Sequence, residues 1–353
     1  MKESLALIDQ SCRGIRPARI PIFDVLQNDA VVAHYSGMKL DGTDDAQAMI
    51  LAAGAALDGT RHVAPPYPEG YTRTDRTGNT HEGARWTMWL KTHAFTSPEQ
   101  WTAWLPDHIA WLESRPPTTL EEKEAERQRQ LGLNRRLNGS MFIHCTPLTA
   151  INNILFGYHC GLDTFPYLWM DERPLVLRWM RALRKDTLRG IEFWAHKDTG
   201  PLAMIYSDVA YHQKLMFAPE TMREMGFFDD VAAICDRCHQ KGVAVIFHSD
   251  GYVMEILDDL IAAGIDGLNP LEKAAGMDIY EVRRKHPELI LVGGVDVSHL
   301  MPFGTAAEVR RETRRIIDGI GAQGRFLIGS TTEIGDDIPL SNYLAFHDEA
   351  MKG

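Results

Sequence analysis

The chain has 353 residues and a formal net charge of −11, because 37 lysines and arginines face 48 aspartates and glutamates. This acidic balance argues against partners such as nucleic acid or an anionic membrane surface, since both select a basic face. The start of the chain has no export-type apolar core, no apolar run approaches 18 residues, and the five cysteines are sparse. We therefore expect a reduced, cytoplasmic protein without a membrane partner.

Residues 1–140 form an irregular first part with few clear signals. A short apolar strand is predicted at Arg19–Phe23 and a helix at Asp44–Leu57, and residues 65–80 are rich in turn formers. Five tryptophans follow between residues 86 and 111, and they predict either core packing or an aromatic lid over an apolar substrate. Residues 121–130 predict a polar helix with a solvated face.

From residue 141 the pattern becomes regular, because short apolar runs alternate with amphipathic helices. Such alternation predicts parallel strands joined by helical crossovers. Each run ends in a polar or glycine-bearing loop, and in a (β/α)8 barrel these ends converge on one mouth. We therefore predict an α/β fold, a single (β/α)8 TIM barrel domain over residues 1–353 with an N-terminal helical extension. The six strands are predicted at residues 141–145, 203–208, 243–250, 264–270, 289–296 and 325–331.

The segment FHSDG, residues 247–251, is the sharpest chemical feature. His248 and Asp250 are two apart at a strand end and point the same way, so they can bind a metal or act as acid and base. Alternatively, Asp250 caps the next helix while His248 satisfies a backbone carbonyl. Asp208, at another strand end, can bind a substrate hydroxyl, hold a proton or cap a helix. Glu272 is a third ligand, a base or a solvated loop acid.

Two other motifs have weaker implications. Asp296 follows Gly293 and Gly294 and is either a residue of the mouth or a turn former. The segment CDRCH, residues 235–239, matches the Cys-x-x-Cys-His motif of haem attachment sites but lies inside a predicted helix. We therefore expect structural cysteines there.

Residues 140–350 resemble the uroporphyrinogen decarboxylase superfamily, whose fold is a (β/α)8 barrel. The matching stretches are residues 145–174, 207–225, 245–279, 291–296 and 328–346. True uroporphyrinogen decarboxylases carry an early arginine-rich signature, and the segment RPARIPIFDVLQND at residues 16–29 lacks it. The chain looks closer to the branch of cobalamin-dependent methyltransferases, which transfer a methyl group between a small molecule and a separate corrinoid protein.

The resemblance also implies a metal site. In several of these methyltransferases zinc is held by a His-x-Cys pair and a late cysteine, and related barrels add a glutamate 24 residues after the histidine. Here His248 matches the histidine and Glu272 the glutamate, because 272 − 248 = 24, but Asp250 replaces the first cysteine. The late cysteine region reads GSTTE at residues 329–333. A set of His248, Asp250 and Glu272 can still hold zinc as a harder site.

The resemblance favours a methyltransferase that takes a methyl group from a small donor, such as an O-methyl aromatic ether, and passes it to cobalamin on a corrinoid protein. Oxygen leaving groups need a Lewis acid or a proton, which His248, Asp250 and Asp208 can supply. Tyr206 and Tyr211 are expected to line an aromatic pocket, and Asn269 and Asp296 to bind substrate. The alternatives are a cofactor-free decarboxylase with a basic pocket and a binding barrel without catalysis.

Overall fold

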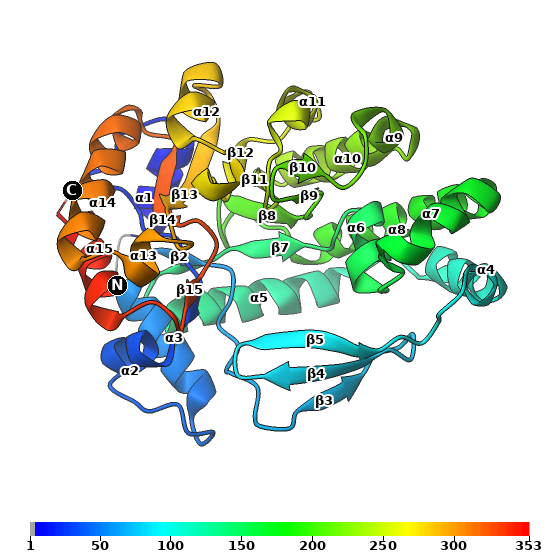
Figure 1. Ribbon diagram of the computed structural model, residues 1–353, viewed down its shortest axis with the longest axis horizontal. Helices are drawn as coiled ribbons and strands as arrows, with labels where there is room; N and C mark the ends of the chain where they lie inside the picture. Colours follow the sequence, from blue (N-terminus) through cyan, green and yellow to red (C-terminus); the bar gives the residue numbers. More distant parts are fainter. Residues whose placement is uncertain (1–3, 353) are drawn as a thin grey trace.

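A computed structural model describes residues 4–352. Its centre is a parallel sheet of six strands in the order β7-β8-β11-β12-β13-β14 (Figure 1). This confirms the predicted α/β class, and all six strands predicted after residue 140 are present. They are β7 (His144–Thr146), β8 (Leu202–Tyr206), β11 (Ala244–His248), β12 (Gly267–Asn269), β13 (Ile290–Val295) and β14 (Phe326–Ser330).

Helices connect each strand to the next, as the alternation predicts. Because a parallel partner requires a crossover, these helices cover the sheet and bury its apolar strands. Within residues 4–352, no helix has the length and apolar character needed to cross a membrane. The connecting helices and short strands are α6 (Ala150–Asn152), the π-helix η1 (Asn153–Gly157), α7 (Gly161–Asp171), α8 (Arg173–Trp194), β9 (Ala210–Tyr211), β10 (Lys214–Leu215), α9 (Pro219–Glu224), α10 (Phe227–His239), η2 (Met254–Ile256), α11 (Leu257–Ala262), η3 (Lys273–Ala275), α12 (Ile279–Lys285), α13 (Leu300–Phe303), α14 (Ala306–Ile320), η4 (Gly321–Gln323), β15 (Ile334–Gly335) and α15 (Leu340–Ala350).

Backbone pairing continues beyond the β14 edge of the sheet. Ile22 forms a parallel bridge with Ile328 of β14, so the predicted strand at residues 19–23 extends that edge. Phe23 forms a parallel bridge with Gly59 of β2 (Gly59–Thr60), which in turn pairs with β6 (Met141–Phe142). One residue separates β6 from β7, the strand at the opposite edge.

The core has two parts. The larger one lies between strands and helices, and it includes the buried cysteines Cys235 and Cys238 of α10, in agreement with the structural interpretation. The smaller one is formed mainly by strand side chains that pack on one another. Its members are Ile8, Phe23, Met141, Ile143, Leu202, Met204, Ile246, Ile290, Val292 and Leu327.

The N-terminal part contains helices, as predicted, and a sheet that the sequence did not predict. The strands β3 (Thr72–Thr74), β4 (Thr80–Ala84) and β5 (Thr87–Thr92) form an antiparallel sheet. Its strands are largely exposed and lack the apolar alternation that predicts a half-buried strand. The helices are α1 (Ser4–Cys12), α2 (Asp29–Ser36), α3 (Asp45–Ala56), α4 (Pro98–Ser114) and α5 (Leu120–Arg136), and β1 (Leu26–Gln27) pairs with β15.

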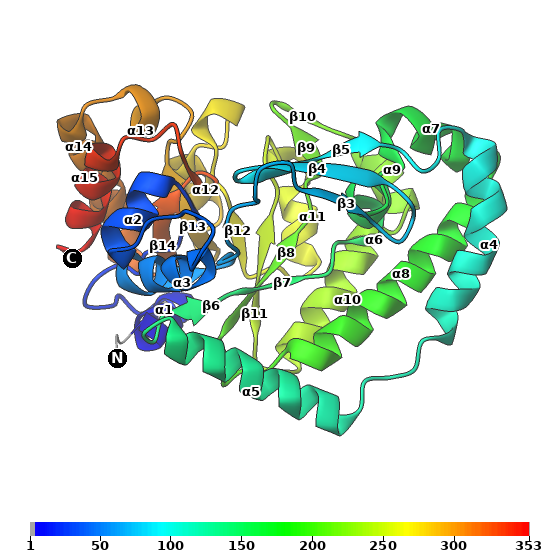
Figure 2. The same ribbon diagram turned by 90° about the horizontal axis from the view of Figure 1, so that it is seen from below.

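Hydrogen bonds connect both ends of this three-stranded sheet (Figure 2) to the rest of the chain. Trp86, at the turn between β4 and β5, donates its indole N–H to Asp336, which follows β14 and β15. At the other end Asn79 donates its amide N–H to the carbonyl of Tyr158, just after η1. The sheet therefore runs from the segment that follows β14 to the segment that follows β7. Trp101 is buried, as core packing requires, whereas Trp89 and Trp111 are exposed, and the aromatic lid stays a prediction.

Candidate functional site

The polar residues predicted at the strand ends lie together at the carboxyl ends of β8, β11 and β12. Within the parallel ladder, His248 is in register with Tyr206 on one side and Asn269 on the other. Asp208 and Asp250 each follow a strand end by two residues. Because neighbouring parallel strands end at one edge, the fold brings these five residues together.

The imidazole of His248 is held in one orientation. Its Nδ1 lies 2.5 Å from the amide oxygen of Asn269, and the amide nitrogen of Asn269 donates to the carbonyl of Val292 at 3.0 Å. This second bond fixes the amide, so Nδ1 carries the hydrogen and Nε2 presents its lone pair. Nε2 lies 3.8 Å from a carboxylate oxygen of Asp208 and 3.8 Å from one of Asp250. No group in the described part of the chain forms a hydrogen bond with Nε2.

Burial, followed by the positive charge of Arg61, lowers the pKa of His248 to about 3. The ring is therefore neutral near pH 7, as a metal ligand or a proton acceptor must be. This arrangement contradicts the alternative in which His248 satisfies a backbone carbonyl, because its partner is the side chain of Asn269.

The two carboxylates that face His248 differ in their partners. Asp208 accepts the backbone N–H of Asp250 at 3.0 Å, whereas Oδ1 of Asp250 has no hydrogen-bond partner among the described residues. Burial raises the pKa of both, and for Asp250 the nearby charges of Asp208 and Glu272 raise it further, to about 7. Asp250 can therefore hold or release a proton near neutral pH.

The donor atoms of Asp208, His248 and Asp250 lie within 4.8 Å of one another. One imidazole nitrogen and two carboxylate oxygens are donors that zinc accepts in catalytic sites. The orphaned Nε2 of His248 and the unpaired Oδ1 of Asp250 are the atoms that a cation would satisfy. The residues present thus fit a divalent cation, with Asp208 in the place that the sequence assigned to Glu272.

Glu272 lies beside this group and supports its loop. Its carboxylate accepts the backbone N–H of Gly251 at 2.7 Å. Gly251 has φ +81°, a left-handed conformation, and an added Cβ would lie 3.0 Å from Ala210. The steep turn after Asp250 therefore depends on Gly251, and the hydrogen bond to Glu272 holds this turn in place.

Arg61, which the sequence analysis did not identify, is the positively charged residue beside Tyr206 and His248. The guanidinium of Arg61, directly after β2, lies 5.0 Å from the ring centre of Tyr206, and Tyr206 stacks on His248 with ring centres 4.4 Å apart. Arg61 also lies 3.6 Å from Glu333, inside the GSTTE segment. A two-residue strand is too short to be recognised by its pattern, so nothing marked residue 61 as a strand end.

The remaining predicted residues lie elsewhere or have other partners. Tyr211, in the β9–β10 hairpin, is 79% exposed. Asp296 accepts the backbone N–H groups of Ser298, His299 and Leu300, as the turn-former alternative requires. The substrate-binding roles of Tyr206, Tyr211, Asn269 and Asp296 stay predictions.

Comparison with known proteins supports the resemblance seen in the sequence. Residues 225–352 match the family described as uroporphyrinogen decarboxylase (URO-D). A methyltransferase from Methanosarcina mazei has a similar structure, with a TM-score of 0.66 and 12% identity over 99% of this chain and 98% of that one. No curated protein matches the chain. The family match thus supports the resemblance over residues 225–352, and the whole chain shares its fold with a methyltransferase of known structure.

Proposed function

We propose that this chain is the substrate-side methyltransferase of a corrinoid system, which takes a methyl group from a small donor and passes it to cobalt on a separate corrinoid protein. One observation carries the proposal: the neutral imidazole of His248 presents an unpaired Nε2 to two carboxylates at the carboxyl end of the sheet. The shared fold with a methyltransferase supports it. O-methyl aromatic ethers are the donor class that suits this oxygen- and nitrogen-rich site.

We also propose that the strands close into a (β/α)8 barrel. The support is the chain of parallel pairings that leads from β14 through Ile22, Phe23 and β2 to β6, which precedes β7. The small inner core supports the same closure, because Phe23 and side chains of β6, β8, β11, β13 and β14 pack on one another. A closed barrel would place the site at its mouth, where such folds perform chemistry.

In the proposed reaction the C–O bond of the donor breaks and its electron pair stays on oxygen, while an electron pair of the cob(I)alamin acceptor forms the new bond to the methyl carbon. Without a bound cation, protonated Asp250, whose pKa is about 7, can give the departing oxygen a proton. Asn269 holds His248 in place, and Tyr206 covers one face of its ring. Alternatively, the deprotonated Asp208 and Asp250 and the neutral His248 would hold zinc, which when bound would supply Lewis-acid polarisation of the same oxygen in place of that proton.

The alternative function, a cofactor-free decarboxylase with a basic pocket, is not favoured by the charged residues around the site. A porphyrinogen with many carboxylates needs several cations at the mouth. Arg61, the cation that acts on Asp208, His248 and Asp250, already lies beside Glu333.

The test is spectroscopic. The protein is mixed with cob(I)alamin and a panel of methyl donors, and the absorbance of methylcobalamin is followed. We expect methylcobalamin with at least one methoxyarene, and loss of the reaction in Asp250→Ala with folding retained by circular dichroism. Asp258→Ala is the control, because the Asp258 side chain is 94% exposed and lies on η2–α11. Full activity in Asp250→Ala, or carbon dioxide release without methyl transfer, would overturn the proposal.

A further inference from the structure

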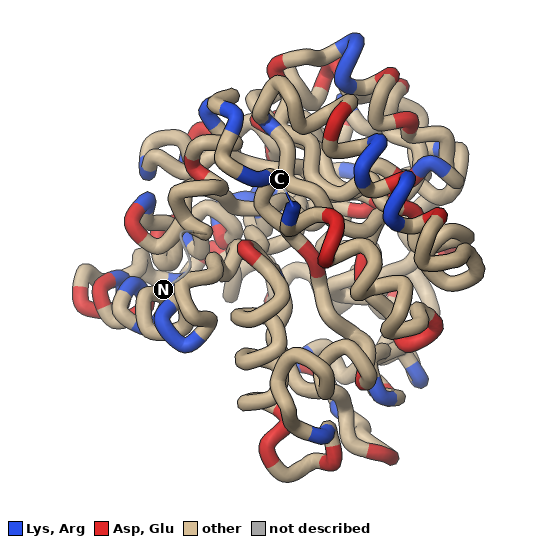
Figure 3. The backbone as a smooth tube through the Cα atoms, turned by 90° about the vertical axis from the view of Figure 1, so that its left-hand side faces the viewer, with Lys and Arg blue, Asp and Glu red and all other residues tan. Residues whose placement is uncertain are grey.

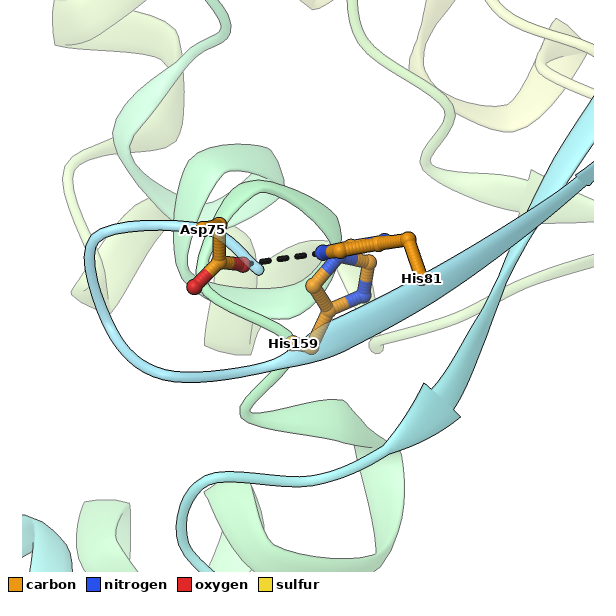
Figure 4. A group of neighbouring side chains, drawn as sticks. All are labelled: Asp75, His81 and His159. Atoms are coloured by element: carbon orange, nitrogen blue, oxygen red, sulfur yellow. Dashed lines mark hydrogen bonds and ion pairs between the residues drawn. The ribbon is translucent and has the colours of Figure 1, made fainter. Parts of the chain in front are cut away.

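A second group of metal-ligating side chains lies outside the site described above. Asp75 is in the turn between β3 and β4, His81 is in β4, and His159 follows the π-helix η1 (Figure 4). Their donor atoms lie within 4.8 Å of one another. The group therefore joins the three-stranded sheet to the segment after β7, two parts of the chain that are far apart in sequence.

The carboxylate of Asp75 is fixed by its own turn. Oδ1 accepts the backbone N–H groups of Thr77, Gly78 and Asn79 at 2.9–3.0 Å. Oδ2 lies 2.9 Å from Nε2 of His81, whose side chain is 4% exposed. The bonds from Asn79 and His81 orient the carboxylate of Asp75 toward a buried imidazole.

His159 approaches this pair from the other part of the chain. Its ring centre lies 4.9 Å from that of His81, and Figure 4 shows one of its ring nitrogens beside the atoms that join Asp75 and His81. The backbone of His159 has φ +59°, a left-handed conformation that non-glycine residues rarely adopt.

We propose that Asp75, His81 and His159 bind a zinc-class divalent cation with one coordination position open to the neighbouring cavity. Zinc bonds of about 2.0–2.1 Å in a tetrahedral site separate the ligand atoms by roughly 3.4 Å. Asp75 and His81 would therefore move apart by about half an ångström, with His81 in the tautomer that has its hydrogen on Nδ1 and leaves Nε2 free. Two imidazoles and a carboxylate with an open fourth position are the donor set of several catalytic zinc sites.

The open coordination position of the cation would face a cavity. All three residues line a cavity of about 490 Å³ between the sheet and η1. Arg73 and Arg76 line the same cavity, and their charge favours an anion such as chloride or a carboxylate at the open position. The cation would fasten the sheet to the segment after β7, where the bond from Asn79 to Tyr158 already holds it.

The experiment separates this site from the one at His248. Metal is removed from the purified protein with a chelator, and zinc binding is measured by competition with a chromophoric chelator in a His248→Gln background. We expect one zinc per chain, and at least a roughly tenfold weaker affinity when His159→Gln is added. His93→Gln is the matched control, because His93 is an exposed histidine just after β5. Circular dichroism of the metal-free proteins checks that each variant folds.

A second measurement covers the case in which His248→Gln fails to fold. Anomalous scattering at the zinc edge, from crystals of the wild-type protein with zinc, should give a peak between Asp75, His81 and His159. Equal zinc affinity for the His159→Gln and His93→Gln variants, or zinc-bearing crystals without that peak, would overturn the proposal. Neither measurement depends on methyl transfer.

Discussion

Asn269→Ala isolates the element that orients the reactive imidazole. Asn269 is 2% exposed, and its amide bridges Nδ1 of His248 and the carbonyl of Val292. The substitution leaves both of these buried groups without a partner. The imidazole is then free to rotate or to place its hydrogen on Nε2, and in either case it no longer presents a lone pair to Asp208 and Asp250.

The magnitude follows from these two contacts. A buried polar group left without a partner costs about 1–3 kcal/mol, so the free energy of unfolding should fall by about 2–6 kcal/mol. Loss of the group that orients a metal-binding histidine reduces metal affinity or activity by about 10–100-fold. That range corresponds to about 1.4–2.8 kcal/mol. Asn269→Ala should therefore lower both the free energy of unfolding and the metal affinity or activity. A control variant has to show that the loss of function does not come from the loss of stability.

Asn342→Ala is the matched control for this test. Asn342 is 4% exposed, and its amide donates to the carbonyls of Met301 and Gly304, away from the site. Chemical denaturation should give similar losses of stability for the two variants. Zinc affinity and the rate of methyl transfer to cob(I)alamin, measured well below the melting temperature, should fall only in Asn269→Ala. Equal values for the two variants would refute the idea that Asn269 sets the orientation of His248.

Two further predictions concern charge. The pKa of Asp250 is raised from 3.8 to about 7, so the folded state binds the extra proton between these values and stability should fall as pH rises from about 4 to about 7. Denaturation in chelator should show a flatter pH profile for Asp250→Asn, and parallel profiles would contradict the assignment. Arg61→Met removes the charge that lowers the pKa of His248 and Asp250, so NMR titration should show both pKa values rise. Arg311→Met, at a side chain 70% exposed on α14, should leave them unchanged.

The second half of the fold could be predicted because its signals are local. Each apolar run followed by a polar loop marks a buried parallel strand and its carboxyl end, so His248, Asp250 and Asp208 could be placed at one edge before any coordinates existed. The spacing of residues in the sequence did not determine which carboxylate, that of Asp208 or that of Glu272, lies with His248 and Asp250. Glu272 matches by count, yet its carboxylate turns to the backbone of Gly251, and Asp208 approaches His248 instead.

The first half carries signals that are too short or too exposed to recognise. Arg61 follows a two-residue strand, and the sheet β3–β5 has little buried apolar surface. Asp75 and His81 look like ordinary turn and strand residues until His159 lies beside them, across a separation of about 80 positions. Such a contact is set by the tertiary fold, and no periodicity in one sequence reveals it.

The bridge between Ile22 and Ile328, which joins the start of the chain to β14, has a consequence for synthesis. Asp24 accepts both the N–H and the hydroxyl of a residue 306 positions later, beside the bridge between Ile22 and Ile328. A ribosome that adds about 5–20 residues per second needs about 15–60 s to make that stretch. For this time the backbone edge that pairs with β14 in the folded protein has no partner, although Phe23 can already pair with Gly59 on its other side.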